Sequence, residues 1–286
     1  MSNFFDATTI YKTRQLYQAS DIPTRDDLLL AMIQSTTREI EEFANRQYYP
    51  VIATYRESAP RQGYGTRFSG LPPEIVLHHD LLAITSVTNG DGTVLVKGTD
   101  YETDPLDDTP YSSLVTLEAS GTAWLPTTAG NYRGAISIAG VWGYHSNYGS
   151  AWIDTLAVAS AISTTSTTSV TATAGKVYAG DLIQIDSEWM YVVSVSTGAS
   201  DTLTVRRGVN GSTAATHGAN AIISRYTFEA IEDVCRTGVV AYYRTRNHPT
   251  GETVTIDGQT FSTPKDVHQW INKRLMGLGL IRTGMG

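Results

Sequence analysis

The densest group of oxygen ligands in the sequence lies between residues 100 and 108. Its members are Asp100, Glu102, Asp104, Asp107 and Asp108. Clustered carboxylates are the ligands that Ca²⁺ prefers, but the glycine and the closing glutamate of an EF-hand loop are missing from this stretch. The spacing therefore favours a solvated acidic loop over a metal site.

Two histidines and one cysteine are the other candidates for metal binding or catalysis. His78 and His79 are adjacent, and adjacent residues of a strand point to opposite faces, so the pair does not easily share one ion. Cys235 falls on the apolar stripe of a predicted helix, which favours a core residue over a nucleophile. The sequence has no nucleophile-elbow, zinc-protease, Walker or dinucleotide-binding motif. We therefore expect no catalytic residue, no metal and no cofactor, and we do not expect an enzyme.

A group of aromatic residues surrounds the Gly-rich stretch 143–150. Its members are Trp124, Trp142, Tyr144, Tyr148 and Trp152. Aromatic rings can stack on sugars, which is one interpretation of the group. Trp and Tyr are also enriched in subunit interfaces. Packing in a core or an interface is therefore favoured over carbohydrate binding.

Composition and charge exclude several classes of protein. The chain has 286 residues, enough for roughly two domains, and no run of about 18 apolar residues that would span a membrane. It lacks a signal-peptide pattern, and its one cysteine cannot form an internal disulfide, so we expect folding in a cytoplasm. The net charge of −7 argues against an electrostatic grip on nucleic acid, but it does not exclude DNA passing through a wide channel.

Three segments show the spacing of amphipathic helices. The first runs from Asp26 to Gln47, with Thr24 as its N-cap and Asp27 in the position of a capping box. The second runs from Phe228 to Arg246, and the third begins at Thr263-Pro264. Their apolar stripes supply the predicted helical core, which consists of Leu29, Ile33, Ile40, Phe43, Ile231, Val234, Val239, Trp270 and Ile271.

Two stretches have the period of two that is typical of β-strands. The first extends from Val51 to about Trp142 and contains Asn89-Gly90, a strong hairpin signal between strands. The second extends from about Ser169 to Ser224. Between them, Trp152 to Ala161 is expected to form a short helix or a linker. The expected strands are 74–77, 83–88, 93–96, 101–103, 114–117, 135–142, 181–186, 189–196, 202–206 and 221–224.

This order of elements predicts an α+β fold. The terminal helices each carry an apolar stripe that must be covered, so we expect them to pack against one another. The predicted architecture is a small helical core from the N- and C-terminal helices, residues 1–50 and 226–286, with two inserted antiparallel β units. One is a sandwich or barrel at residues 51–150, and the smaller one occupies residues 151–225. The glycines after residue 276 predict a flexible C-terminal tail.

Three helical segments share a recognisable pattern. The first is Asp26-Asp27-Leu28-Leu29-Leu30 followed by residues 38–50, in which an Ile-acidic-x-aromatic stretch leads to the exit Arg46-Gln47-Tyr48. The late helix from Phe228 to Arg246 and the closing helix, whose match runs from Asp266 to Leu275, follow in matching order and spacing. Together these segments resemble the head-tail connector (adaptor) proteins of tailed bacteriophages. Residues 180–190 and 206–217 are similar to β modules of phage structural proteins. The compact members of the connector family lack so large a β insertion.

The resemblance implies a structural role in the neck of the virion. Copies of the chain would form a ring of roughly twelve subunits below the portal protein, through a repeated heterologous contact. Genomic DNA would pass nonspecifically through the lumen, and a tail-side neck protein, a stopper or a tail terminator, would bind below. The C-terminal segment would dock on the portal. The residues expected to make that contact are Arg274, Leu278, Leu280, Ile281 and Arg282.

The alternative is another component of the virion. A tail-completion or baseplate protein with glycan-binding β modules would use the aromatic group around residues 143–150. A hydrolase would need one convergent polar pocket, and no motif points to one.

Overall fold

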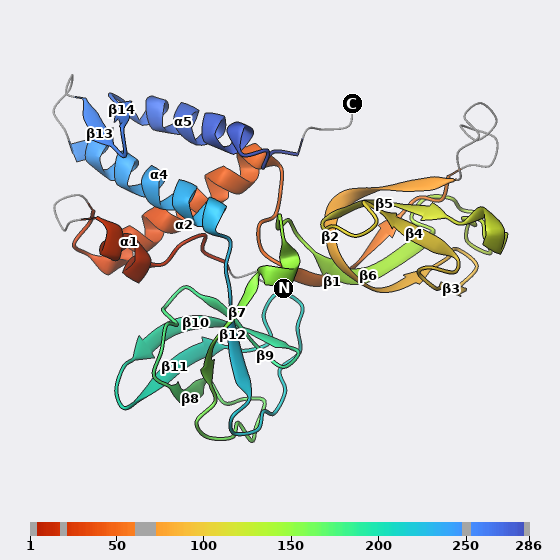
Figure 1. Ribbon diagram of the computed structural model, residues 1–286, viewed down its shortest axis with the longest axis horizontal. Helices are drawn as coiled ribbons and strands as arrows, with labels where there is room; N and C mark the ends of the chain where they lie inside the picture. Colours follow the sequence, from red (N-terminus) through yellow and green to blue (C-terminus); the bar gives the residue numbers. More distant parts are fainter. Residues whose placement is uncertain (1–4, 18–21, 61–72, 248–252, 283–286) are drawn as a thin grey trace. The chain divides into compact units, whose positions relative to one another are not determined.

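The computed structural model describes residues 5–17, 22–60, 73–247 and 253–282 (Figure 1). The chain divides into two compact units. Tyr49–Ser150 form the insertion unit, and Met1–Tyr48 with Ala151–Gly286 form the helix–barrel unit. Helices and antiparallel sheets make the protein broadly α+β, which confirms the predicted class at this coarse level.

The helix–barrel unit contains the described α-helices. They are α1 (Ile10–Leu16), α2 (Asp26–Ala44), α4 (Glu229–Asn247) and α5 (Pro264–Gly277). A hairpin of β13 (Val254–Ile256) and β14 (Gln259–Phe261) joins α4 to α5. Helices α2, α4 and α5 pack against one another. A Cβ atom on Gly238 of α4 would lie 3.0 Å from Ile271 of α5 and 3.2 Å from Thr36 of α2, so the missing side chain lets the three helices approach closely.

Most of the predicted helical core is buried. Relative exposure is at most 1% for Leu29, Ile33, Ile40, Ile231, Val234, Val239 and Ile271. The prediction needs correction at Phe43 and Trp270, which are only half-buried. Each lies at the margin of its apolar stripe, next to the buried Ala44 or Ile271. Trp270 packs edge-on against Phe261, with 5.8 Å between the ring centroids.

The observed termini of helices α2 and α5 agree with the predicted ones only in part. Helix α5 begins at Thr263-Pro264 as predicted, and the Thr263 side chain caps the Asp266 amide. Helix α2 begins at Asp26 as predicted, but its N-cap residue and its C-terminal end differ from the prediction. Its N-cap is Arg25 rather than Thr24, with no side-chain bond, and it stops at Ala44 because Asn45 takes the left-handed conformation with φ of 48°.

Six strands of the helix–barrel unit form one antiparallel sheet. They are β7 (Trp152–Ala157), β8 (Ser169–Thr173), β9 (Leu182–Ile185), β10 (Glu188–Ser196), β11 (Ser200–Arg206) and β12 (Ile222–Tyr226), in the order β7-β12-β9-β10-β11-β8. A bridge between Val158 and Ala172 joins the first strand region to the last, so the sheet closes into a barrel. The expected helix or linker at 152–161 was wrong, because its first half pairs with β12 along the whole of β7.

The insertion unit is a second antiparallel sheet. Its strands are β1 (Val51–Glu57), β2 (Glu74–Thr88), β3 (Val94–Leu95), β4 (Tyr101–Asp104), β5 (Tyr111–Thr116) and β6 (Ile136–Trp142), in the order β1-β6-β2-β5-β4 with β3 beside β2. Short 3-10 turns occupy Glu118–Ser120 and Tyr148–Ser150. The two strands expected at 74–77 and 83–88 are one continuous strand with irregular register. The predicted hairpin is confirmed, since the Asn89 amide donates to Thr93 O at 2.8 Å.

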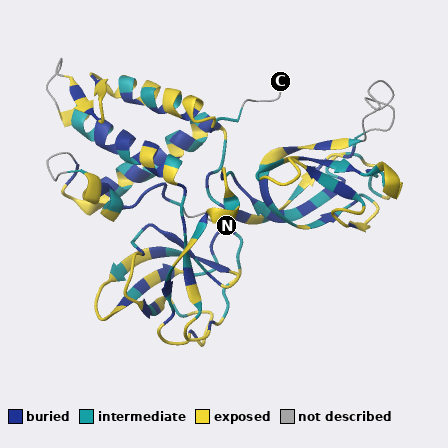
Figure 2. Ribbon diagram, viewed as in Figure 1, coloured by how far each residue is buried: buried dark blue, intermediate teal, exposed yellow. Residues whose placement is uncertain are grey.

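Strand β6 shows how the insertion unit makes its core. Its residues alternate between buried and partly buried, as Figure 2 shows along the strand. Trp142 at its end and Trp124 are 1% and 2% exposed. Their indole N–H groups donate to the carbonyls of Ala53 and Pro73 at 3.0 and 3.1 Å, so both rings are buried without leaving a polar group unpaired.

Gly140 of β6 allows close packing against β2. A Cβ atom there would lie 2.2 Å from the carbonyl oxygen of Ala83. We expect Gly140→Ala to destabilise the protein by about 1–3 kcal/mol in urea unfolding, because backbone must shift to admit the methyl group. The control is Gly149→Ala, whose nearest atom would be 3.6 Å away and which we expect to change stability by less than about 0.5 kcal/mol. Equal losses from the two substitutions would contradict this account of β6.

Candidate functional site

The residues predicted to bind a portal lie at the end of α5 and just beyond it. Leu280 is 3% exposed, and its carbonyl accepts the Tyr48 hydroxyl at 2.7 Å. The Arg282 amide donates to Ala44 O at 2.9 Å. The expectation of a free tail is therefore wrong for residues 278–282, because the buried Tyr48 hydroxyl requires an acceptor and finds it there. Gly284 and Gly286 lie outside the described residues.

Part of the predicted set remains at the surface. Leu278 is 39% exposed and Met276, which was not predicted, is 61% exposed. The Arg274 side chain is 50% exposed and lies 4.0 Å from Asp233. Ile281 is half-buried. We call Arg274 and Leu278 the α5-end surface, because these exposed residues are four apart at the end of α5 and so present a cation and an apolar group on one face.

Tyr48 organises the point where the chain leaves the helices. It is fully buried, its carbonyl accepts the Tyr226 hydroxyl at 3.0 Å, and its ring packs on Phe228 with 5.8 Å between centroids. The next residue of that strand end, Thr227, donates its amide to Ala151 O at 2.8 Å. Tyr48 and Ala151, which flank the insertion unit in the sequence, are thus both held by consecutive residues of the helix–barrel unit.

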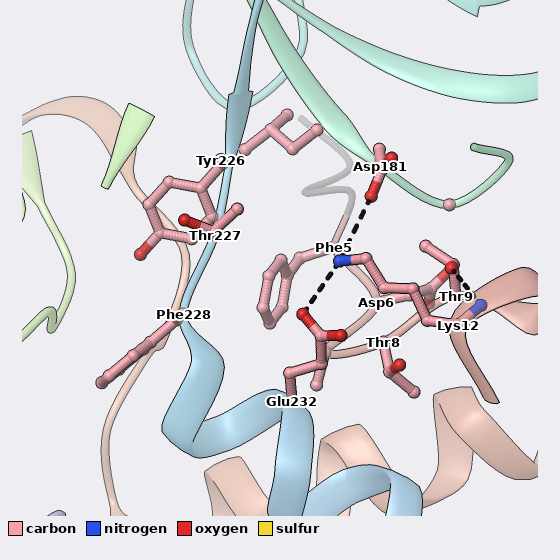
Figure 3. A pocket seen from close by; sticks show the side chains of 13 residues that line it. Phe5, Asp6, Thr8, Thr9, Lys12, Asp181, Tyr226, Thr227, Phe228 and Glu232 are labelled. Atoms are coloured by element: carbon pink, nitrogen blue, oxygen red, sulfur yellow. Dashed lines mark hydrogen bonds and ion pairs between the residues drawn. The ribbon is translucent and has the colours of Figure 1, made fainter. Parts of the chain in front are cut away.

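A charged cavity lies where α1, the first turn of α4 and the barrel meet (Figure 3). Lys12 Nζ is 2.8 Å from Glu232 Oε2 and 3.9 Å from Asp181 Oδ1. The three side chains are between 3% and 14% exposed. Figure 3 shows the Lys12 side chain reaching between the two carboxylates. We call this site the Lys12 cavity; it joins the helices to the barrel through buried charge.

The two aspartates of the Lys12 cavity are incompletely compensated. Asp181 accepts the Tyr178 amide at 2.8 Å, and its second cation, Arg225, is also 3.9 Å away. Burial raises the pKa of Asp181 to about 6, against the opposing effect of Lys12 and Arg225. Asp6 accepts the Tyr191 hydroxyl at 2.8 Å, and burial raises its pKa as well. Both carboxyl groups therefore bind a proton more readily here than in water.

A hydroxyl group in the cavity wall lacks a partner. Thr8 is 2% exposed, and its Oγ1 has no hydrogen-bond partner among the described residues. The cavity has room for about one water molecule, and its walls are polar. One ordered water is the ligand that these walls fit.

A second buried ionic network lies inside the barrel. The Glu188 carboxylate accepts hydrogen bonds from Nε and Nη2 of Arg207, each at 2.6 Å, and from the Ala215 amide at 2.9 Å. His217 Nε2 lies 2.9 Å from Glu188, and its Nδ1 lies 2.7 Å from Asp186. Burial alone would raise the pKa of Glu188, but these bonds outweigh it and hold the pKa below its ordinary value. The network ties the long loop after β11 to the β9–β10 turn, which is a structural role.

The acidic loop and the histidine pair do not form a metal site. Asp100 accepts the Val96 amide and the Thr122 hydroxyl, while Asp107 and Asp108 are exposed. His78 Nδ1 lies 2.5 Å from the buried Glu57 carboxylate. Among the residues that the structure describes, no group of three His, Cys, Asp or Glu side chains is arranged to hold a metal ion.

Cys235 and the aromatic group also occupy packed positions. The Cys235 thiol is buried, and burial raises its pKa to about 12, so a thiolate does not form near neutral pH. Trp152 packs with Trp189 and Tyr226 at centroid distances of 5.7 and 5.3 Å. Since Trp124 and Trp142 are core residues, the sugar-stacking interpretation loses two of its tryptophans.

Sequence reasoning missed the Lys12 cavity. Lys12 and Glu232 are 220 residues apart, and each is an ordinary charged residue of a helix in its own segment. No spacing in the sequence relates them, so no local signal identified the site.

No protein-family model, no curated protein and no solved structure matches the chain. In the described part of the chain, no helix has both the length and the apolar character needed to cross a membrane.

A substitution that removes only the Tyr48 hydroxyl tests whether its hydrogen bond anchors the segment after α5. Tyr48→Phe leaves the Leu280 carbonyl without its donor, so we expect a loss of about 1 kcal/mol and faster amide hydrogen exchange in residues 278–282. Tyr226→Phe is the matched comparison, because it removes the bond to the Tyr48 carbonyl and leaves the bond to Leu280. Exchange in 278–282 that is the same in Tyr48→Phe and the parent protein would exclude the proposed anchoring.

The barrel network predicts a large effect at Glu188. Glu188→Gln leaves Arg207 buried without its counter-ion, and we expect a loss of about 3–5 kcal/mol in urea unfolding. Asp186→Asn is the control, since the Asp186 side chain is 64% exposed and its contact is expected to contribute less than about 1 kcal/mol. Because the pKa of Glu188 is lowered, its contribution is present at neutral pH and disappears only below about pH 4. A barrel that tolerates Glu188→Gln as well as Asp186→Asn would refute this assignment.

Proposed function

We propose that this chain is a structural head-to-tail connector subunit of a tailed bacteriophage, forming a ring between the capsid portal and the tail. The observation that carries the proposal is which segments pack together. The connector-like stretches 26–50 and 266–275 belong to α2 with its exit and to α5, and these helices pack on α4. A connector core made from the two ends of the chain accounts for that long-range packing.

In this proposal the barrel and the insertion unit are β additions to a compact helical core. The flanks of the insertion unit support this view, because Tyr48 and Ala151 are held by the consecutive residues Tyr226 and Thr227. An insertion with adjacent ends can be added to a core without rearranging it. The similarity of residues 180–190 and 206–217 to β modules of phage structural proteins also supports a virion component.

The α5-end surface is the part of the predicted portal contact that we retain. Arg274 would meet acidic portal residues, and Leu278 would supply an apolar anchor. Leu280 is removed from the contact set, since it fills the core of its own chain. Ile281 and Arg282 flank it and would contribute at the edge. The acidic net charge suits a lumen through which DNA slides, because negative walls repel phosphate.

The test is electron microscopy of the full chain mixed with the portal protein encoded beside it. We expect a ring of added density below the portal with matching symmetry. The double substitution Arg274→Glu with Leu278→Asp should weaken binding at least about tenfold, because it reverses one charge and buries another in an apolar contact. Lys265→Glu is the control, because it makes the same charge reversal at the other end of α5.

One result would reject the connector role, and a second would reject only the assigned contact surface. No association with the portal, together with labelled chain at the tail tip of intact particles, would favour the baseplate alternative and its glycan-binding β modules. Equal binding by the double variant and Lys265→Glu would keep the connector role and remove the α5-end surface from it.

A further inference from the structure

The Lys12 cavity contains more negative than positive charge at its centre. The carboxylates of Asp181 and Glu232 flank the ammonium group of Lys12, and the carboxylate of Asp6 lines the same cavity. Glu232 takes that ammonium at 2.8 Å and has a second cation, Arg236, at 3.2 Å. The strongest compensation in the cavity therefore goes to Glu232.

Asp181 is left with the weakest compensation. Both of its cations, Lys12 of α1 and Arg225 of β12, lie at 3.9 Å, beyond hydrogen-bond distance. Glu232 of α4 and Tyr191 of β10 face it as further titratable groups and add no positive charge. The only hydrogen bond to its carboxylate among the described residues is the Tyr178 amide. A side chain 3% exposed with so little compensation is costly to keep ionised.

The same cavity supplies the contact between the helices and the barrel. The Tyr11 ring of α1 stacks on Tyr178 at 3.9 Å, and Asp6 accepts the hydroxyl of Tyr191 from β10. The Asp6 carboxylate also accepts a hydrogen bond from the Gln34 side chain and is stabilised by the positive charge of Arg38, and both residues belong to α2. Helix α1 and the preceding residues therefore touch the barrel through aromatic ring contacts and through carboxyl groups whose charge depends on pH.

We propose that the Lys12 cavity is a proton-controlled latch between the helices and the barrel, tightest when Asp181 carries a proton. A neutral Asp181 keeps the bond from Tyr178 and no longer requires a close cation. An ionised Asp181 has to be solvated, which favours opening of the seam. The N-terminal residues 5–12 and the barrel residues 178–192 would then separate more often as the pH rises.

The direction follows from the raised pKa of Asp181. A carboxyl group with a higher pKa in the closed state binds protons more tightly there than when it is open to water. Closure is therefore favoured as pH falls through about 6 and weakened above it. Between about pH 5 and about pH 8, Asp181 alone should raise the opening constant about tenfold. Asp6 adds a smaller effect in the same direction.

Hydrogen–deuterium exchange of the full chain at about pH 5 and about pH 8, corrected for intrinsic rates, tests the latch. We expect about tenfold more opening at the higher pH in residues 5–12 and 178–192. Asp181→Asn keeps the acceptor for Tyr178 and removes the titration of residue 181, so the difference in opening between the two pH values should fall well below tenfold, to the part that Asp6 contributes. The control Asp108→Asn, at an exposed carboxylate, should behave as the parent protein.

A second variant keeps the test decisive if Asp181→Asn does not fold. Lys12→Met removes a cation that favours ionised Asp181, so the midpoint of the opening profile should move to higher pH. The latch is rejected by either of two results. One is a tenfold pH dependence that persists in Asp181→Asn, and the other is a midpoint that does not move in Lys12→Met.

Discussion

The hydrogen bonds of Tyr48 are the constraint on which the arrangement of the helix–barrel unit depends. Its hydroxyl fixes the segment after α5, and its carbonyl fixes the end of β12. Phe228, at the start of α4, packs on its ring. A phenol with no exposed surface must have its hydroxyl paired, so the three segments are specified together rather than one at a time.

Two buried ionic groups of the same unit illustrate opposite solutions to burying a charge. Glu188 accepts charge-assisted bonds from Arg207 and further donors, and its pKa falls. Asp181 has its two cations, Lys12 and Arg225, at 3.9 Å and accepts one backbone amide, and its pKa is raised. Burial raises the pKa in both cases, and only at Glu188 do the hydrogen-bond donors and the nearby cation outweigh it. The first arrangement fixes a loop, while the second leaves a site that responds to protons.

The sequence predicted those features whose cause is local. Thr263-Pro264 and Asn89-Gly90 act within a few residues, and the structure has a helix start and a hairpin there. Asp257-Gly258 is an equally local hairpin signal that was not among the predicted turns, and both residues take positive φ in the β13–β14 turn. The strand β7 was misjudged because its burial does not alternate, and only its pairing with β12 defines it.

The Lys12 cavity could not be predicted from local sequence signals, and the reason is physical. A charged residue on a helix is expected to face solvent unless a partner is known. Lys12 and Glu232 are 220 residues apart in the sequence and come together only through tertiary packing. The prediction for Leu280 was wrong for a related reason. Glycines around an apolar residue predict a flexible tail, and the sequence does not show that the buried Tyr48 hydroxyl donates to the Leu280 carbonyl.

The two residues that flank the insertion unit, Tyr48 and Ala151, are both anchored within the helix–barrel unit by consecutive residues of one segment. The core residues of the two units are different, with Trp124 and Trp142 in one and Ile33 and Ile271 in the other. Substitutions of these core residues in the two units should therefore add independently, because coupling requires contact or a shared partner.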